Sequence, residues 1–107
     1  GSLYVAPDKM LYQTPDFPAV YLPLATAQVK TYFELKERKD VKWTFVSPAA
    51  DFQADGERTG KYILAGDNMT VNAKGESIIS YADYAIALVD EIVSGNHIQE
   101  RISLVRE

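Results

Sequence analysis

The chain of 107 residues contains no cysteine and a single histidine, His97. The lack of cysteine excludes a disulfide framework, a thiolate nucleophile and a Cys/His zinc site, and the lack of a second histidine excludes a pair of histidine metal ligands. Catalysis by this chain would therefore have to use hydroxyl groups, carboxylates or a borrowed cofactor.

A long uninterrupted hydrophobic run is also missing. The most apolar stretch, residues 81–93, is interrupted by Asp83, Asp90 and Glu91, whereas a membrane-spanning helix needs about 20 apolar residues. We therefore expect no membrane partner. No basic-then-apolar leader opens the chain, so we expect a cytoplasmic location.

Positive charge is scarce. The chain has 11 Lys and Arg against 15 Asp and Glu, a net charge of -4. The basic residues also alternate with acidic ones, as in residues 36–40, which disfavours nucleic acid as a partner.

A composition of 47% hydrophobic and 24% charged residues is typical of a folded chain. We find no repeat or linker, and we expect residues 1–107 to form a single domain.

Hydrophobic spacing predicts the first elements. Residues 3–5 resemble the end of a strand, and a helix is expected from Leu22 to about Lys39, with Pro23 in its first turn. The β-branched and aromatic residues 41–47 predict a strand with both faces covered.

The segment 49–58 follows the carboxyl end of that strand and lacks periodicity, so we expect a loop there. In α/β folds such loops border the ligand site. Residues 61–65 predict a short strand. The segments 69–73 and 76–79 predict a hairpin around Lys74 and Gly75.

A second helix has the strongest signals. Ser80 is suited to cap it, Asp83 would stand at the third helical position, and Gly95 would end it. Residues 101–105 then predict a final strand, and we expect His97 to satisfy the last carbonyl groups of the helix.

This order of elements is typical of the later part of a doubly wound sheet. The predicted fold is α/β, the carboxyl-terminal part of a Rossmann-like doubly wound sheet that lacks the first strands and the glycine-rich turn. Because no G-x-G-x-x-G sequence is present, the chain alone is not expected to bind a dinucleotide tightly.

Three segments carry a family resemblance: WTFVSPAA at 43–50, GERTGKY at 56–62 and ISYADYA at 79–85. They resemble the carboxyl-terminal half of the NAD(P)H-binding, NmrA-like proteins. These are atypical short-chain dehydrogenases often described as NADH-flavin reductases. The similarity extends over nearly the whole chain and is most specific between residues 43 and 60.

The resemblance implies a fragment of an NAD(P)H-dependent reductase that transfers hydride to a flavin, FAD or FMN, or to a similar conjugated acceptor. Its partners would be the dinucleotide and that acceptor. Its nucleotide fingerprint would lie upstream of Gly1, and the isolated segment would be inactive. Some NmrA-like proteins instead sense dinucleotides without turnover, and this alternative stays open.

The resemblance also implies roles for individual residues. Ser47, Pro48 and Ala49 correspond to the stretch along the nicotinamide, although Pro48 could simply end a strand. Ser2 matches the serine that donates a hydrogen bond to a substrate oxygen. A cloning remnant ending in Gly-Ser would have the same sequence, and the assignment of Ser2 depends on its being native.

Tyr21 resembles the tyrosine that opens the active-site helix, but Ala25 replaces the expected lysine. Without that ammonium group, Tyr21 is in doubt as a general acid, and packing or orienting a ligand is the simpler role. Phe52 could stack on an acceptor ring or cap the core. Arg58 could bind a phosphate or carboxylate of the substrate or neutralise nearby acidic residues.

Missing first strands would leave apolar surface and a strand edge uncovered. We therefore expect the isolated chain to form a homodimer or a swapped assembly, or else to be held by residues outside this segment.

Overall fold

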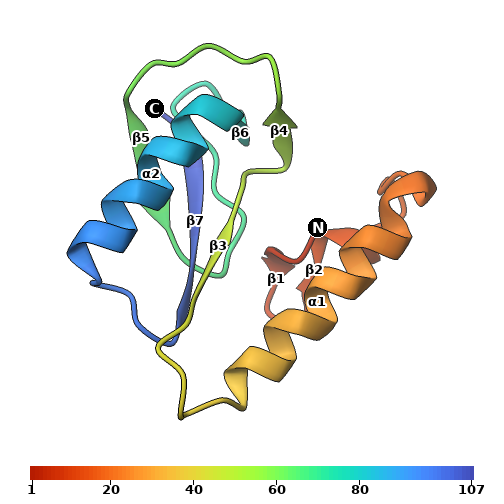
Figure 1. Cartoon of the computed structure of the whole chain (residues 1–107). Coiled ribbons are helices and arrows are strands. Elements are labelled where there is room, and N and C mark those ends of the chain that lie inside the picture. The colour runs from red at the N-terminus through yellow and green to blue at the C-terminus, as the bar shows by residue number, and fades with distance from the viewer.

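The structure is a computed structural model that describes residues 1–107, and Figure 1 shows the arrangement of its elements. The chain forms, in order, β1 (Tyr4–Ala6), β2 (Lys9–Met10), the 3-10 turns η1 (Leu11–Gln13) and η2 (Ala19–Tyr21), α1 (Leu22–Lys36), β3 (Thr44–Ser47), β4 (Asp51–Gln53), β5 (Tyr62–Ala65), β6 (Ile78–Ser80), α2 (Tyr81–Ser94) and β7 (Glu100–Arg106).

The strands form mixed sheets. The three-stranded sheet has the order β3-β7-β5, in which β3 and β7 run parallel and β5 runs antiparallel to β7. Strands β4 and β6 form a separate parallel pair, and β1 and β2 form an antiparallel pair. The predicted α/β class is therefore confirmed.

Both faces of β3 are covered, as predicted. Successive residues of a strand point to opposite faces, and Phe45 and Val46 pack in different clusters. Phe45 packs with Met10, Val29 and Tyr32, which include the inner face of α1. The neighbouring side chain, Val46, packs against the cluster that contains Ala49, Ile79, Ala87, Leu104 and Val105, on the side of α2.

The helix boundaries follow the local signals. The Ser80 hydroxyl accepts a hydrogen bond from the Asp83 amide at 3.0 Å, and Gly95 adopts the left-handed conformation with φ of 61°. These features begin and end α2 as predicted. Helix α1 begins at Leu22 with Pro23 in its first turn, as predicted, but ends at Lys36 rather than near Lys39.

The predicted hairpin over residues 69–79 is wrong. The side chain of Asn72 accepts hydrogen bonds from the amides of Lys74 and Glu76, and it donates one to the Arg106 carbonyl. This makes a tight turn, which one backbone hydrogen bond from the Asn72 amide to the Glu76 carbonyl closes, but residues 69–73 form no strand. Residues 78–80 pair instead with 51–53, inside the segment expected to be a loop.

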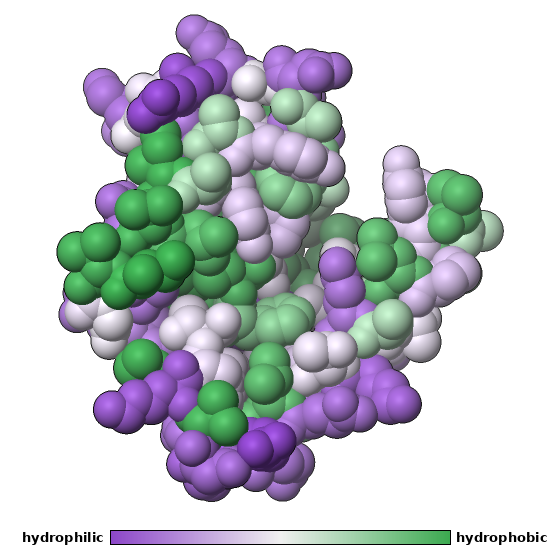
Figure 2. Space-filling view, viewed as in Figure 1, coloured by the Kyte–Doolittle hydropathy of each residue, from purple (hydrophilic) through white to green (hydrophobic).

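Apolar residues on the outer face of α2 stay exposed. Figure 2 shows hydrophobic residues gathered on this side of the molecule, and the most exposed are Val89, Ile92 and Val93. Strand β3 lies at the edge of the three-stranded sheet, so one side of its backbone pairs with no other strand. None of the helices is both long and apolar enough to cross a membrane.

Candidate functional site

A cavity of about 240 Å³ lies at the carboxyl end of β3. It is bordered by segments far apart in the sequence: the start of the chain, α1, β3 with the residue after it, β4 and α2. The lining residues are Gly1, Ser2, Leu3, Leu24, Gln28, Phe45, Val46, Ser47, Pro48, Phe52 and Tyr84.

Four of the residues predicted to form a site come together here: Ser2, Ser47, Pro48 and Phe52. Ala49, which was predicted to lie along the nicotinamide with Ser47 and Pro48, does not line the cavity. It packs in the core beneath α2 and is only 4% exposed.

Two predicted residues lie elsewhere. Tyr21 stands before the first turn of α1, is 56% exposed and does not line the cavity. Arg58 borders a separate depression over α2, with Ala82, Ala85, Ile86, Val89 and Asp90. The structure therefore does not bring either residue to the carboxyl end of β3.

Residues 1 and 2 are packed into the fold. The Gly1 carbonyl accepts a hydrogen bond from the Tyr12 amide, and a Cβ added at Gly1 would lie 2.9 Å from the Cβ of Ala25. Ser2 is 6% exposed. A side chain at position 1 would displace Ala25 of α1, so glycine suits this close approach.

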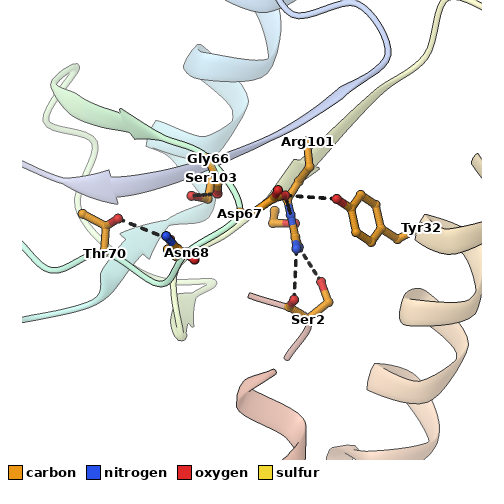
Figure 3. A network of polar contacts seen from close by, with 9 residues as sticks. Ser2, Tyr32, Gly66, Asp67, Asn68, Thr70, Arg101 and Ser103 are labelled. Carbon is orange, nitrogen blue, oxygen red and sulfur yellow. Dashed lines mark hydrogen bonds and ion pairs between the residues drawn. The ribbon is translucent and has the colours of Figure 1, made fainter. Parts of the chain in front are cut away.

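The guanidinium of Arg101 contacts both serines, and Figure 3 shows its bonds to Ser2 and Asp67. Its Nη1 donates to the Ser2 hydroxyl at 2.8 Å and to the Ser47 hydroxyl at 3.2 Å, and its Nη2 donates to the Ser2 carbonyl at 3.0 Å. Its Nε donates to Asp67 at 2.9 Å, and no part of the side chain is exposed. Sequence reasoning missed this residue, because a charged residue at the start of a predicted strand carries no local sign of burial.

Tyr32 of α1 completes this network. Its hydroxyl donates to the Asp67 carboxylate at 3.0 Å, and its ring lies 4.4 Å from the Arg101 guanidinium carbon. Burial, together with the hydrogen bond to Asp67, raises the pKa of Tyr32 to about 12. Tyr32 therefore stays protonated at neutral pH and ties α1 to the final strand.

Aromatic residues form the other side of the cavity. The ring of Phe52 lies 4.2 Å from that of Tyr81 and 5.0 Å from that of Tyr84, in tilted arrangements. Phe52 therefore contacts the first turn of α2, and it keeps 36% of its surface exposed. The Tyr84 hydroxyl donates to the Val46 carbonyl at 2.8 Å, and burial raises the pKa of Tyr84.

A buried carboxylate fixes the loop beside β4. Asp83 is 0% exposed and accepts hydrogen bonds from the amides of Thr59 and Gly60, both at 2.9 Å, and from the Thr59 hydroxyl at 2.7 Å. Gly56 is also required here, because a Cβ would lie 2.7 Å from the Cβ of Ser80. The loop is therefore held against the start of α2.

His97 does not have the partner that we expected. Its ring contacts the carboxylate of Glu91, a buried residue of α2, and its backbone amide donates to the same carboxylate. It borders a larger cavity of about 610 Å³ near the start of β7, away from Ser47. None of the predicted site residues lines that larger cavity.

The chemistry available at the smaller cavity is limited by these residues. Tyr84 is the only titratable side chain that lines it, and its proton is directed to a backbone carbonyl. Hydroxyl groups, a rigid proline and an aromatic ring can bind and orient a planar ligand, but they supply no strong acid or base. The site thus fits chemistry in which another group carries the reaction.

No protein-family model matches the sequence. The uncharacterised protein YwnB of Bacillus subtilis is 49% identical over 109 residues, which cover 100% of this chain and 51% of YwnB. The chain thus spans about half the length of this curated relative.

Solved structures are similar over the same extent. A Streptococcus pneumoniae protein described as a candidate NADH-flavin reductase has a TM-score of 0.95 and 55% identity, over 100% of this chain and 52% of its own. A candidate epimerase from Bacteroides thetaiotaomicron has a TM-score of 0.91 and 40% identity, over 99% and 49%. A Burkholderia pseudomallei protein described as a candidate exported protein has a TM-score of 0.89 and 42% identity, over 98% and 50%.

Proposed function

We propose that this chain, which corresponds to the carboxyl-terminal half of an NmrA-like, NADH-flavin reductase-type protein, is part of an NAD(P)H-dependent reductase. In this reductase the chain would form the part of the active site that binds the hydride acceptor. The acceptor is a flavin or another conjugated ring that takes hydride from the dinucleotide. In this proposal β3 and β7 belong to a Rossmann-like doubly wound sheet whose dinucleotide fingerprint is contributed by a segment other than this chain.

The observation that carries the proposal is the meeting of Ser2, Ser47, Pro48 and Phe52 at one cavity. Parallel α/β sheets bind ligands at the carboxyl ends of their strands, and these residues come from three separate segments at such an end. Their arrangement fits a nicotinamide along Ser47–Pro48 and an acceptor ring beside Phe52.

The protein's part in this reaction is placement. NAD(P)H, when bound, supplies the hydride. Ser47 and Pro48 orient the nicotinamide, Phe52 packs on the acceptor ring, and the apolar lining excludes water from between them. Hydride transfer to a flavin needs no strong protein acid, which agrees with a cavity whose one titratable side chain is Tyr84.

Steady-state kinetics of the complete gene product test this function. We expect oxidation of NADH or NADPH that depends on added FMN, FAD or a quinone, and a loss of kcat/KM in Phe52→Ala. The exposed ion-pair variant Arg38→Ala is the matched control, because the side chain of Arg38 bonds only to Asp40. Dinucleotide binding without turnover would refute the reductase function.

A second function is dinucleotide sensing without catalysis. The observation that keeps it open is the position of Tyr21, the tyrosine expected to open the active-site helix, which is exposed and does not line the cavity. A sensor would bind the dinucleotide in the complete gene product and change its association with a partner, with no consumption of NADH or NADPH under any acceptor.

A further inference from the structure

Ser2 and Ser47 have hydroxyl protons that no protein group accepts. Each hydroxyl oxygen accepts a hydrogen bond from Nη1 of Arg101, at 2.8 and 3.2 Å. Neither hydroxyl donates a hydrogen bond to any other residue of the chain, and both serines are buried, at 6% and 5% exposure. A serine hydroxyl has one proton to donate in addition to its acceptor lone pairs.

The remaining direction for these protons is the cavity. A hydroxyl proton is not directed at an arginine N–H group, because both are donors. Both serines line the 240 Å³ cavity at the end of β3, and both hydroxyl oxygens lie within hydrogen-bond distance of the same nitrogen, Nη1 of Arg101. A buried donor without an acceptor is costly, so an oxygen from a ligand or from water belongs in front of them.

Each guanidinium nitrogen of Arg101 makes at least one hydrogen bond, and Arg101 borders the larger cavity of about 610 Å³ but not this one. Its Nε bonds to Asp67, its Nη2 to the Ser2 carbonyl, and its guanidinium lies over the ring of Tyr32. These contacts hold the side chain from several sides, and Arg101 does not line the smaller cavity. Arg101 therefore makes no direct contact with this cavity, and its hydrogen bonds reach the lining only through the two serines.

We propose that Arg101 is a positioning residue that fixes Ser2 and Ser47 as paired hydrogen-bond donors, and that the cavity takes a ligand carbonyl or carboxamide oxygen between them. The permanent positive charge of the guanidinium behind the hydroxyls favours an electron-rich oxygen in this place. This inference rests on the proposed function and deepens it, because both the nicotinamide carboxamide and the carbonyl groups of a flavin offer such an oxygen.

The test compares ligands that differ in this one atom. Dissociation constants of the complete gene product are measured for NADH and NADPH and for their thionicotinamide analogues, in which sulfur replaces the carboxamide oxygen. A second arm measures KM and kcat with FMN. The variants are Ser2→Ala/Ser47→Ala, Arg101→Met and Ser47→Thr, which keeps the hydroxyl, with Arg38→Met as the control on an exposed arginine.

If the oxygen is that of the carboxamide, the wild type prefers the oxygen-containing dinucleotide by about 2- to 12-fold for each hydroxyl. The double serine variant and Arg101→Met lose this preference, whereas Ser47→Thr and Arg38→Met keep it. If the oxygen is that of the flavin, the preference is absent and KM for FMN rises by a similar factor in the same two variants. Either result supports the inference and identifies the source.

Equal binding preference and equal FMN kinetics in wild type, the double serine variant and Arg38→Met overturn the inference. The serine variants keep Arg101 in place, so this comparison holds even if Arg101→Met does not fold. A wild type that neither binds dinucleotide nor reduces FMN refutes the proposed function instead. In that event a crystal structure decides: an oxygen within hydrogen-bond distance of both hydroxyls supports the inference, and hydroxyls that donate to protein groups overturn it.

Discussion

Replacing Asp83 by asparagine removes the negative charge from a carboxylate that is fully buried at the start of α2. The carboxylate accepts two hydrogen bonds from backbone amides and one from a hydroxyl, all contributed by Thr59 and Gly60. Hydrogen bonds to a charged group stabilise by about 1.5–3 kcal/mol and neutral ones by about 0.5–1.5 kcal/mol. Loss of charge removes about 1–1.5 kcal/mol from each of the three bonds and therefore lowers the free energy of unfolding by about 3–4.5 kcal/mol.

The pH dependence follows from the pKa of Asp83. Burial raises this pKa, but the hydrogen bonds from Thr59 and Gly60 more than offset burial, so the pKa lies below its ordinary value. The stabilisation is complete above the unfolded pKa of about 3.9 and is lost as the pH falls through the lower folded pKa. The difference between wild type and Asp83→Asn should thus be constant near neutral pH and shrink below about pH 4.

Urea unfolding of the complete gene product, followed by circular dichroism from neutral to acidic pH, measures this difference. Asp55→Asn is the control, because Asp55 is exposed and makes no side-chain hydrogen bond, and we expect it to stay within about 0.5 kcal/mol of wild type. A stability of Asp83→Asn equal to that of the control at neutral pH would refute the reasoning. So would a difference that does not change with pH.

Further predictions follow from the same structure. Tyr32 should ionise near its pKa of about 12, so its stabilising hydrogen bond is present below about pH 10 and is lost as the pH rises through the folded pKa. The tyrosinate absorbance of wild type minus that of Tyr32→Phe measures this ionisation, and a titration midpoint near pH 10 would contradict the prediction. Gly95→Ala should lower stability by about 1 kcal/mol, because Gly95 has φ of 61°; an unchanged unfolding midpoint contradicts this. Residues 1–107 alone should self-associate through the free edge of β3 and the apolar face of α2; a folded monomer in sedimentation velocity contradicts this.

The sequence was sufficient where structure depends on neighbouring residues. Ser80 and Gly95 carry the signals that begin and end α2, and both act within one helical turn. The hairpin prediction failed because Asn72 bonds to the Arg106 carbonyl, and β6 pairs with β4 across a large separation in sequence. A turn signal such as Lys74-Gly75 does not show which segments will pair around it.

The site divides in the same way. The strand over residues 41–47 indicated a ligand loop at its carboxyl end, and the resemblance named Ser2, Pro48 and Phe52 as residues of that site. Arg101 could not be predicted, since its burial results from contacts with Ser2, Ser47 and Asp67, all at least 34 positions away in the chain. Tyr21 was misplaced because the start of α1 was taken as the start of the site, whereas the cavity borders α1 further along, at Leu24 and Gln28.

The central claim is that the cavity at the carboxyl end of β3 receives the nicotinamide. A crystal structure of the complete gene product with NAD⁺ or NADP⁺ tests it most directly. We expect the nicotinamide ring against Ser47 and Pro48, with its other face open toward Phe52. A dinucleotide bound with its nicotinamide outside this cavity would show that the proposed function is wrong.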